Sequence, residues 1–570
     1  METDSRRTGL GAIIGVLTAA VAVGIAELVA GFTGENTWPV VAVGQVSINF
    51  TPAPVKNFAI SAFGSHDKLV LVSGILVVLV IFAALIGVAA MRRFEYGLAG
   101  LVAFALVGIA AAATRPNAPA TAVLPTLIGA AGGAGMMALL LRAAGQAPGR
   151  QAAGNRAAGN QAAGAAGQGR AAGSTGPGST PGGRPAAGRP GVRPGAYRPG
   201  PPARYGSRPG VPADPERRRL LITGAAAVGT AALSGLAGRA LAERTGVSQA
   251  QRALRLPPPA RPAPPLPAGT DLRIPGLSTF ITPNNSFYRV DTAIVLPEVV
   301  PASWQLRIHG MVSREITLTF DELIRRPLIE DYITLTCVSN PVAGPYVGNA
   351  KWLGASLTAL LRQAGVRAGA DQMLCTSADG FTSGTPLQTA MDGRDAMIAV
   401  AMNGAALPVA HGFPARMVVP GLYGYVSACK WITDIEVTTF RSSVAYWAQR
   451  GWDQQAPIKT ESRIDVPGGD TQVKPGPTRI AGVAWAQHKG IEAVEVRVDR
   501  GPWQQARLAA VPGVDTWRQW VLDWTATPGG HVIEARATDK TGFTQTAAQA
   551  PPEPNGATGY PAVSVSVLNA

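Results

Sequence analysis

The sequence predicts a multi-domain protein with an N-terminal α-helical transmembrane bundle, an α+β domain and a C-terminal immunoglobulin-like β-sandwich. Three observations predict this architecture. Nearly uncharged stretches precede residue 142, strand and helix patterns alternate over residues 271–441, and short alternating strands separated by turn residues follow. A hydrophobic fraction of 47% with only 15% charged residues indicates that part of the 570-residue chain lies in lipid.

The anchor is expected over residues 1–142, with the lipid bilayer as its partner. Each of its four apolar stretches is long enough to cross a hydrocarbon core of roughly 30 Å at about 1.5 Å per residue. Arginines at 6–7, at 92–93 and from 142 onward all fall on one side, which the positive-inside rule assigns to the cytoplasm. The four stretches are Leu10–Phe32, Leu69–Met91, Tyr96–Thr114 and Ala120–Leu141.

A cytoplasmic linker is predicted over residues 143–216, where Ala-Ala-Gly and Arg-Pro-Gly units repeat without apolar periodicity. Such a segment buries too little surface to offset its chain entropy, so we expect it to be disordered. Residues 142–219 hold 13 Arg and no Lys, and most of the net charge of +15 therefore belongs to this segment. Binding of RNA or anionic lipid stays open beside a plain solvated linker, but charge next to apolar helices is first a topology signal, and we expect no nucleic-acid partner.

Residues 217–242 contain a fifth apolar stretch, Leu220–Gly238, directly after three arginines. It is either a fifth transmembrane helix or a twin-arginine-like export signal, so the number of spans is four or five. Both alternatives place the rest of the chain outside the cytoplasm, in a multi-pass protein of the cell membrane. Residues 243–270 are Pro-rich and are predicted to be a semi-rigid spacer.

The two remaining domains are predicted from periodicity. In residues 271–441 the expected strands are Trp304–His309, Ile316–Phe320, Ile333–Val338, Met373–Ser377, Met397–Met402, Met417–Val419 and Lys430–Thr438, with helices at Phe320–Arg325 and Ala355–Ala364. In residues 442–570 a connector to residue 476 precedes the expected strands Arg479–Gln487, Ala493–Val498, Trp503–Leu508, Trp517–Trp524, Gly530–Thr538 and Ala562–Leu568. The first pattern is typical of an α+β domain and the second of a β-sandwich.

The three cysteines are Cys337, Cys375 and Cys429, and they form neither a CxxC pair nor a CxxCH haem-attachment motif. No disulfide framework is indicated. A buried inert thiol is the ordinary role of a lone cysteine, and for Cys375 and Cys429 we expect packing roles.

An ordered set of motifs surrounds Cys337. It comprises Ile281-Thr-Pro-Asn284, Phe287-Tyr288-Arg289, Leu335-Thr-Cys337-Val-Ser-Asn340, Gly348-Asn-Ala-Lys-Trp352-Leu-Gly354, Asp379-Gly380-Phe381, His411-Gly-Phe-Pro-Ala-Arg416, Pro420-Gly421, Gly424 and Lys430-Trp431. In this order and at these spacings the motifs resemble the sulfite oxidase family of molybdopterin enzymes, including its bacterial methionine sulfoxide reductase branch. The resemblance covers about residues 271–570, because the sandwich is also similar to the family's dimerisation domain, which allows a homodimer.

The resemblance implies a Mo-molybdopterin cofactor with Cys337 as the catalytic residue and molybdenum ligand. A soft thiolate suits molybdenum already held by dithiolene sulfurs. Arg416 and Lys430 are the implied phosphate contacts, and Asp379 is implied at the pterin edge, since a phosphate needs cationic groups and a pterin needs mixed polar ones. The full set of implied cofactor-binding residues is Asn284, Tyr288, Arg289, Thr376, Asp379, His411, Arg416, Ser427 and Lys430.

Three departures from the family pattern concern the substrate. Sulfite oxidases carry an arginine pair shortly after the cysteine, where this chain continues to Pro341-Val342. The family's active-site tyrosine aligns with Trp452, and Arg289-Val-Asp-Thr292 stands in place of Arg-Asn-His. We therefore expect a small-molecule substrate that is more apolar or larger than sulfite.

The leading hypothesis is an extracytoplasmic oxidoreductase that transfers an oxygen atom to or from this substrate. Because none of the five His lies in a predicted transmembrane helix, we expect no haem in the chain and a separate electron partner: a cytochrome, a quinone or a membrane haem subunit. The alternative is a membrane-tethered binding or assembly protein with an inactive molybdopterin fold. A transporter with a sensor domain is disfavoured because Glu27 is the only ionisable residue within the predicted helices.

Overall fold

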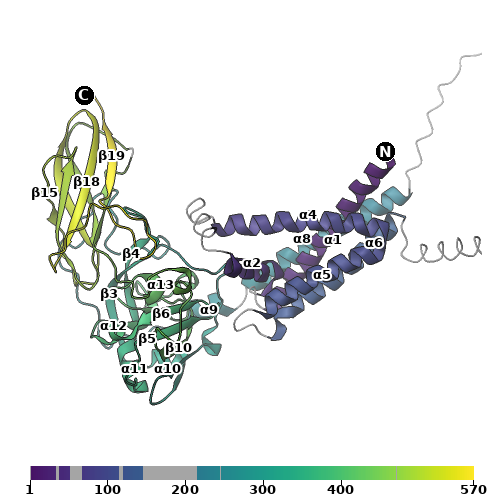
Figure 1. Ribbon diagram of the computed structural model, residues 1–570, viewed down its shortest axis with the longest axis horizontal. Coiled ribbons are helices and arrows are strands. Elements are labelled where there is room, and N and C mark those ends of the chain that lie inside the picture. The colour runs from purple at the N-terminus through teal and green to yellow at the C-terminus, as the bar shows by residue number, and fades with distance from the viewer. Residues whose placement is uncertain are drawn as a thin grey trace, which may run out of the picture. The chain divides into compact units, whose positions relative to one another are not determined.

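The computed structural model describes residues 2–33, 37–51, 55, 67–114, 120–145, 215–243, 246–469 and 471–569. The predicted linker over residues 143–216 lies almost entirely outside the described residues. The chain divides into two compact units, one of residues 1–22, 78–103 and 129–233, the other of residues 23–77, 104–128 and 234–570. The helical segments and the β-rich C-terminal region are separated by colour in Figure 1.

Long apolar helices make up the N-terminal part. Among the described residues, five helices are long and apolar enough to cross a membrane, and each covers most or all of one of the five apolar stretches of the sequence. That they span a bilayer stays a prediction. The helices are α1 (Glu2–Thr33), α2 (Pro39–Phe50), α4 (Asp67–Arg92), α5 (Phe94–Ala113), α6 (Leu124–Ala143) and α8 (Pro215–Glu243); α2, which begins at a proline and has only 12 residues, was not predicted.

Glycines let these helices touch along their backbones. A Cβ placed on Gly15 of α1 would collide with the carbonyl oxygen of Ala83 of α4, and one on Gly87 of α4 would collide with that of Gly11. Further along α1, a Cβ on Gly238 of α8 would lie 2.6 Å from the carbonyl oxygen of Glu27. Contacts this close are the usual function of small residues between apolar helices.

The α+β region holds two sheets, labelled in part in Figure 1. One has the order β2-β1-β10-β5-β6 and the other β3-β4-β7-β8, with β9 paired to β7. The strands are β1 (Gln305–Gly310), β2 (Ile316–Thr319), β3 (Leu328–Thr336), β4 (Val347–Ser356), β5 (Gln372–Ser377), β6 (Thr382–Pro386), β7 (Met397–Met402), β8 (Ala405–Ala406), β9 (Arg416–Val418) and β10 (Ile432–Thr438). The helices are α9 (Gly246–Ala253), α10 (Phe320–Ile324), α11 (Leu357–Ala364), α12 (Leu387–Met391) and α13 (Gly424–Ser427).

Local sequence explains several of these boundaries. A capping box between Thr319 and Glu322 ends β2 and starts α10. Ser356 caps α11 and Gly365 ends it with a φ of 69°. The expected helix at Ala355–Ala364 therefore begins two residues late, because β4, a strand that was not predicted, runs to Ser356. Every residue of β7, the strand predicted at Met397–Met402, is buried, in keeping with its uninterrupted apolar run.

The Pro-rich stretch is not a free spacer, which corrects the expectation for residues 243–270. Residues 246–253 form α9, and Gln251 donates from Nε2 to the Leu407 carbonyl at 2.5 Å. Further on, Ala260 N donates to the Leu328 carbonyl at 2.8 Å, and Glu330 N donates to the Arg261 carbonyl at 2.9 Å. Ala260 and Arg261 retain the N–H groups that the surrounding prolines lack, so the segment pairs with the edge of β3.

The C-terminal region is two sheets with the orders β11-β13-β17-β16 and β12-β19-β18-β14-β15. Both sheets contribute to one apolar core that includes Ile480, Trp520, Val494 and Ile533. The immunoglobulin-like assignment stays a prediction. The strands are β11 (Glu461–Val466), β12 (Thr471–Val473), β13 (Gly476–Trp485), β14 (Ile491–Val498), β15 (Gln504–Gln505), β16 (Arg507–Leu508), β17 (Arg518–Ala526), β18 (Gly529–Asp539) and β19 (Ala562–Val567).

Two expectations for this region were wrong. The connector to residue 476 contains β11 and β12. The single strand expected at Trp503–Leu508 is two strands in different sheets, since β15 pairs with β14 and β16 pairs with β17. The chain crosses between the sheets at the buried Ala506, whose N–H bonds to the Val494 carbonyl at 2.8 Å.

The C-terminal region is hydrogen-bonded directly to β3. Trp517 N donates to Thr334 Oγ1 at 2.7 Å, and Thr334 N donates to the Asp515 carbonyl at 2.9 Å. Gln487 Nε2 donates at 3.0 Å to both the Thr334 carbonyl and Thr336 Oγ1. The side chains of Trp517, Gln487, Thr334 and Thr336 are all buried, and the strand that leads to Cys337 is therefore supported by the β-rich region.

Candidate active site

Cys337 is the first residue after β3, at the end of a strand as expected, although the strand predicted at Ile333–Val338 ends two residues earlier, at Thr336. The chain turns there because Cys337 N donates to the Tyr346 carbonyl at 2.9 Å, while Asn340 Oδ1 accepts from Tyr346 N at 2.8 Å. The thiol is 9% exposed, and its sulfur lies 3.0 Å from Ser339 Oγ. Burial raises the pKa of Cys337, against the opposing effects of the Ser339 hydroxyl and the Lys430 charge.

Arg416 is a buried cation, at 4% exposure. Its guanidinium donates to the carbonyls of His411 and Ala428 at 3.1 and 3.2 Å and lies 5.0 Å from the centre of the Trp352 ring. Its Nε is buried without a hydrogen-bond partner, and no carboxylate in the described part of the chain forms an ion pair with it. Burial lowers the pKa of Arg416 to about 10. A buried cation in this state fits an anionic ligand.

Lys430 and Arg289 meet at one carboxylate. Lys430 Nζ lies 2.7 Å from Asp291 Oδ2, and Arg289 Nε lies 2.8 Å from the same oxygen. The side chains of Asp291 and Lys430 are only 4% and 10% exposed. Burial lowers the pKa of Lys430 to about 8, although the Asp291 charge acts in the opposite direction.

His411 joins Arg416 to the first motif. Its Nε2 lies 3.1 Å from the Asn284 carbonyl oxygen, and Asn284 Oδ1 accepts from Asn403 Nδ2 at 2.7 Å. Burial, with the Arg416 charge, lowers the pKa of His411 to about 4, so that the imidazole is neutral at pH 7. A neutral imidazole adds no positive charge to the Arg416 side of the site.

Tyr288 is close enough to Cys337 and Arg416 for both groups to affect its pKa. Its ring stacks on Phe287 at 5.2 Å, and burial raises its pKa far above the usual value, with a further contribution from Cys337 and an opposing one from Arg416. Its phenol is therefore a hydrogen-bond donor or acceptor that stays neutral.

The structure does not bring Thr376, Asp379 and Ser427 into direct contact with these groups. Asp379 Oδ1 accepts from Phe381 N at 3.2 Å, and the carbonyl of Thr376 accepts from Thr433 Oγ1 at 3.3 Å. The turn that carries Asp379 is tied to the Lys430 segment, because Ala378 N donates to the Trp431 carbonyl at 2.9 Å. The buried Ser427 hydroxyl bonds to the carbonyls of Leu422 and Tyr423 and so holds α13.

Sequence reasoning missed Asp291 and Ser339 as members of the site. Asp291 was noted only as a departure from the family pattern, although an acid two residues after Arg289 is a signal for a local ion pair. Its contact with Lys430, 139 residues away, has no local signal. Ser339, two residues after Cys337, could have been found as a hydroxyl within reach of the thiol.

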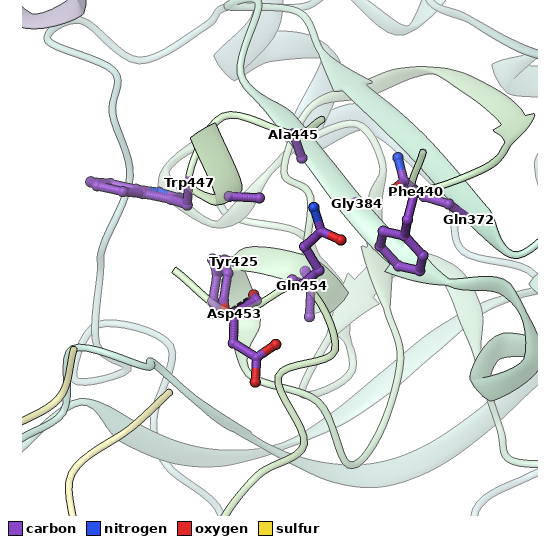
Figure 2. Close-up of a pocket in the computed structure, with 10 residues that line it drawn as sticks. Gln372, Gly384, Tyr425, Phe440, Ala445, Trp447, Asp453 and Gln454 are labelled. Carbon is purple, nitrogen blue, oxygen red and sulfur yellow. Dashed lines mark hydrogen bonds between the residues drawn. The ribbon is translucent and has the colours of Figure 1, made fainter. Parts of the chain in front are cut away.

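Trp452, which aligns with the family's active-site tyrosine, lies in an aromatic cluster. Its ring centre is 6.1 Å from that of Trp447 and 6.0 Å from that of Tyr425. Figure 2 shows Trp447 and Tyr425 at a cavity of about 10 Å³ beside this cluster, with the Tyr425 hydroxyl bonded to the Asp453 carbonyl. A cavity of this volume holds at most about one water molecule.

The buried cations Arg416 and Lys430 and the buried thiol of Cys337 lie in a part of the chain that matches a known protein family. Residues 293–447 match the oxidoreductase molybdopterin binding domain family. The chain carries a sulfite oxidase-like molybdopterin oxidoreductase domain. Seven of the ten predicted site residues lie within the matched residues, whereas Asn284, Tyr288 and Arg289 precede them.

Relatives of this sulfite oxidase-like domain include sulfite oxidase of Gallus gallus, 31% identical over 293 residues, which are 43% of this chain and 63% of that protein. Nitrate reductase (NADH) 1 of Oryza sativa is 33% identical over 196 residues, 29% of this chain and 21% of that protein. The sulfane dehydrogenase SoxCD from Paracoccus pantotrophus is a similar solved structure, with 24% identity, a TM-score of 0.42 and coverage of 47% of this chain and 75% of that one. The chain thus spans less than two thirds of the curated relatives' length.

Proposed function

We propose that the chain is a membrane-anchored Mo-molybdopterin oxidoreductase that catalyses oxygen-atom transfer to or from a small substrate. The observation that carries the proposal is the buried Arg416, which has an unpartnered Nε and no carboxylate neighbour in the described residues, in a domain that matches a molybdopterin-binding family. An anionic cofactor satisfies this guanidinium better than water does. When bound, the cofactor supplies the metal at which oxygen is transferred.

Each predicted site residue has a proposed task. Cys337 offers a soft thiolate to molybdenum, and Ser339 holds the sulfur in place at 3.0 Å. Arg416 and Lys430 bind the cofactor phosphate, while His411, held by the Asn284 carbonyl, and Tyr288 contact the cofactor as neutral groups. Arg289, Asn284, Thr376, Asp379 and Ser427 are proposed as further cofactor contacts, through backbone groups where the side chain is already bonded.

The substrate is proposed to be less strongly anionic than sulfite. Val342 stands where the family has a substrate arginine, and Trp452 stands where it has a tyrosine. Trp452 packs against Trp447 and Tyr425, an apolar and aromatic surface that suits S-oxides or N-oxides with an organic part. A redox-dye screen with sulfite, S-oxides and N-oxides tests this, and ordinary enzymatic rates with sulfite would contradict it.

The location and partners are proposed from the sequence. Arginines flank the apolar helices on one side, which favours an extracytoplasmic site in a cell-membrane protein. Electrons pass to or from a separate cytochrome, quinone or membrane haem subunit. The β-rich region supports a homodimer by its similarity to the family's dimerisation domain.

Molybdenum content separates this proposal from an inactive binding or assembly protein. The full chain, produced with its cofactor machinery, is expected to hold about one molybdenum, and Cys337→Ser is expected to lose most of it. Cys375→Ser is the matched control, because Cys375 is also a buried free cysteine but lies in the core, 3.7 Å from Met417 Sδ. Metal-free wild-type protein would support the alternative, and equal losses in both variants would show that buried serine merely unfolds the domain.

A further inference from the structure

A larger cavity, of about 240 Å³, opens in the β-rich region. It lies where the segment before β11 meets the chain that follows β18, and none of the predicted cofactor-binding residues lines it. A volume of this size admits a small organic molecule.

The floor of the cavity is buried and mixed in character. Ile458 and Ala557 supply apolar surface, and Thr460, Glu461 and Gln545 supply polar groups, all at 5% exposure or less. Thr460 and Gln545 are already satisfied: Thr460 Oγ1 donates to Asp539 Oδ2 at 2.6 Å, and Gln545 accepts from Ser462 Oγ at 2.8 Å.

Glu461 is not satisfied in this way. Its Oε1 is buried without a hydrogen-bond partner among the described residues, and the indole nitrogen of Trp485, its partner in the β11–β13 register, is also unpartnered. Burial raises the pKa of Glu461 to about 8, against the opposing effect of the Lys459 ammonium. At neutral pH the carboxyl is therefore mainly protonated and can donate a hydrogen bond. An unsatisfied buried polar group of this kind needs a ligand or ordered water.

Two lysines and a phenyl ring stand at the rim. Lys459 Nζ donates to Asn555 Oδ1 at 2.8 Å and to the Gly556 carbonyl at 2.6 Å, both uncharged acceptors, and among described residues it has no salt bridge. Lys489 is neutralised by Asp539 at 3.5 Å. Phe543 is 52% exposed, although it lines the cavity. The rim thus combines one ammonium that has no salt bridge among the described residues with a half-exposed aromatic ring, over which Lys489 Nζ lies at 5.9 Å.

We propose that this cavity is a second ligand-binding site, which takes a small organic anion. Its acidic head, a carboxylate or sulfonate, accepts from Lys459 and Glu461, and its apolar body lies between Phe543 and Ile458. The charge of the head compensates the Lys459 ammonium, and the apolar body covers surface that is otherwise in water. The site needs neither the cofactor nor the proposed oxidoreductase activity.

Calorimetric titration of the purified full chain with benzenesulfonate tests the proposal, with benzylamine as a ligand of similar size and opposite charge. We expect saturable binding of benzenesulfonate alone. Lys459→Met should raise its dissociation constant at least about tenfold, as expected for a lost charge-assisted bond. Glu461→Gln, which keeps an N–H donor, should retain most of the affinity.

Two further variants keep the test decisive. Phe543→Ala removes an exposed ring without opening a core cavity and should weaken binding several-fold, even if Lys459→Met does not fold. Lys474→Met removes an exposed lysine that does not line the cavity and should leave binding unchanged. No saturable binding, preference for benzylamine, or equal effects of the Lys474 and Phe543 variants would each overturn the proposal.

Discussion

Replacing Arg416 by methionine tests how the buried guanidinium affects the stability of the cofactor-free chain and the affinity for the cofactor. Burial holds the pKa of Arg416 near about 10 rather than 12.5, which corresponds to about 3 kcal/mol against the charge. Removing the charge recovers that amount but loses two hydrogen bonds to carbonyls, about 1.5 kcal/mol or more each. The two effects nearly cancel, so the free energy of unfolding of the cofactor-free chain should change by about 2 kcal/mol or less.

In the loaded protein the balance differs, because the bound anion would lose its buried partner at a cost of about 3–5 kcal/mol. We expect Arg416→Met to bind the cofactor at least about 10²-fold more weakly, which is measured as a loss of molybdenum per chain. The variant should also lose the rise in unfolding temperature that cofactor binding causes. Arg518→Met is the matched control, since Arg518 also donates to two carbonyls, at 2.7 and 2.9 Å, but lies on β17. Wild-type molybdenum content and an unchanged rise in unfolding temperature in Arg416→Met would refute the reasoning.

Three further changes have directions fixed by the structure. Asp291→Asn should destabilise the cofactor-free chain by about 3 kcal/mol at pH 6, because Lys430 loses the carboxylate that stabilises its charge. The loss should be smaller at pH 9, where Lys430, whose pKa in the unchanged chain is lowered to about 8, has already shed its proton; thermal unfolding at the two pH values checks this. Glu461→Gln should stabilise by about 4 kcal/mol at pH 7.5, because the folded-state pKa is raised from 4.5 to about 8, so the gain should vanish at pH 4.5 and grow up to pH 8. Gly354→Ala should cost about 3 kcal/mol, because the new Cβ would meet the β7 backbone, whereas Gly513→Ala, in open space, should change the unfolding temperature little.

Local patterns in the sequence predicted much of the fold. The apolar run at Met397–Met402 predicted β7 with its observed bounds, and the placement of Cys375 in the core is confirmed. By contrast β4 was missed because Gly348, Lys351 and Gly354 interrupt its pattern, although eight of its ten residues are buried between neighbours on both sides. A strand buried on two faces does not alternate, so its identity depends on tertiary partners.

The same distinction applies to the site. The ordered motifs were sufficient to identify the family and to select the buried cations, but not to pair them. The Asp291–Lys430 contact depends on the final packing of segments far apart in the chain, which no local spacing encodes. Similarly, the unsatisfied Glu461 could not be recognised, since a glutamate that begins an alternating strand is ordinarily at the surface.

The bonds from Trp517 and Gln487 to Thr334 connect β3, the strand that leads to Cys337, directly to the C-terminal region. A chain shortened to end after β10 would leave the buried Thr334 and Thr336 without these partners, so the truncated domain is expected to lose the position of Cys337 as well as its stability. Conversely, a protein that docks on the C-terminal region would affect the position of β3 through the same hydrogen bonds. Docking on the C-terminal region and the position of Cys337, the proposed metal ligand, would then be thermodynamically linked.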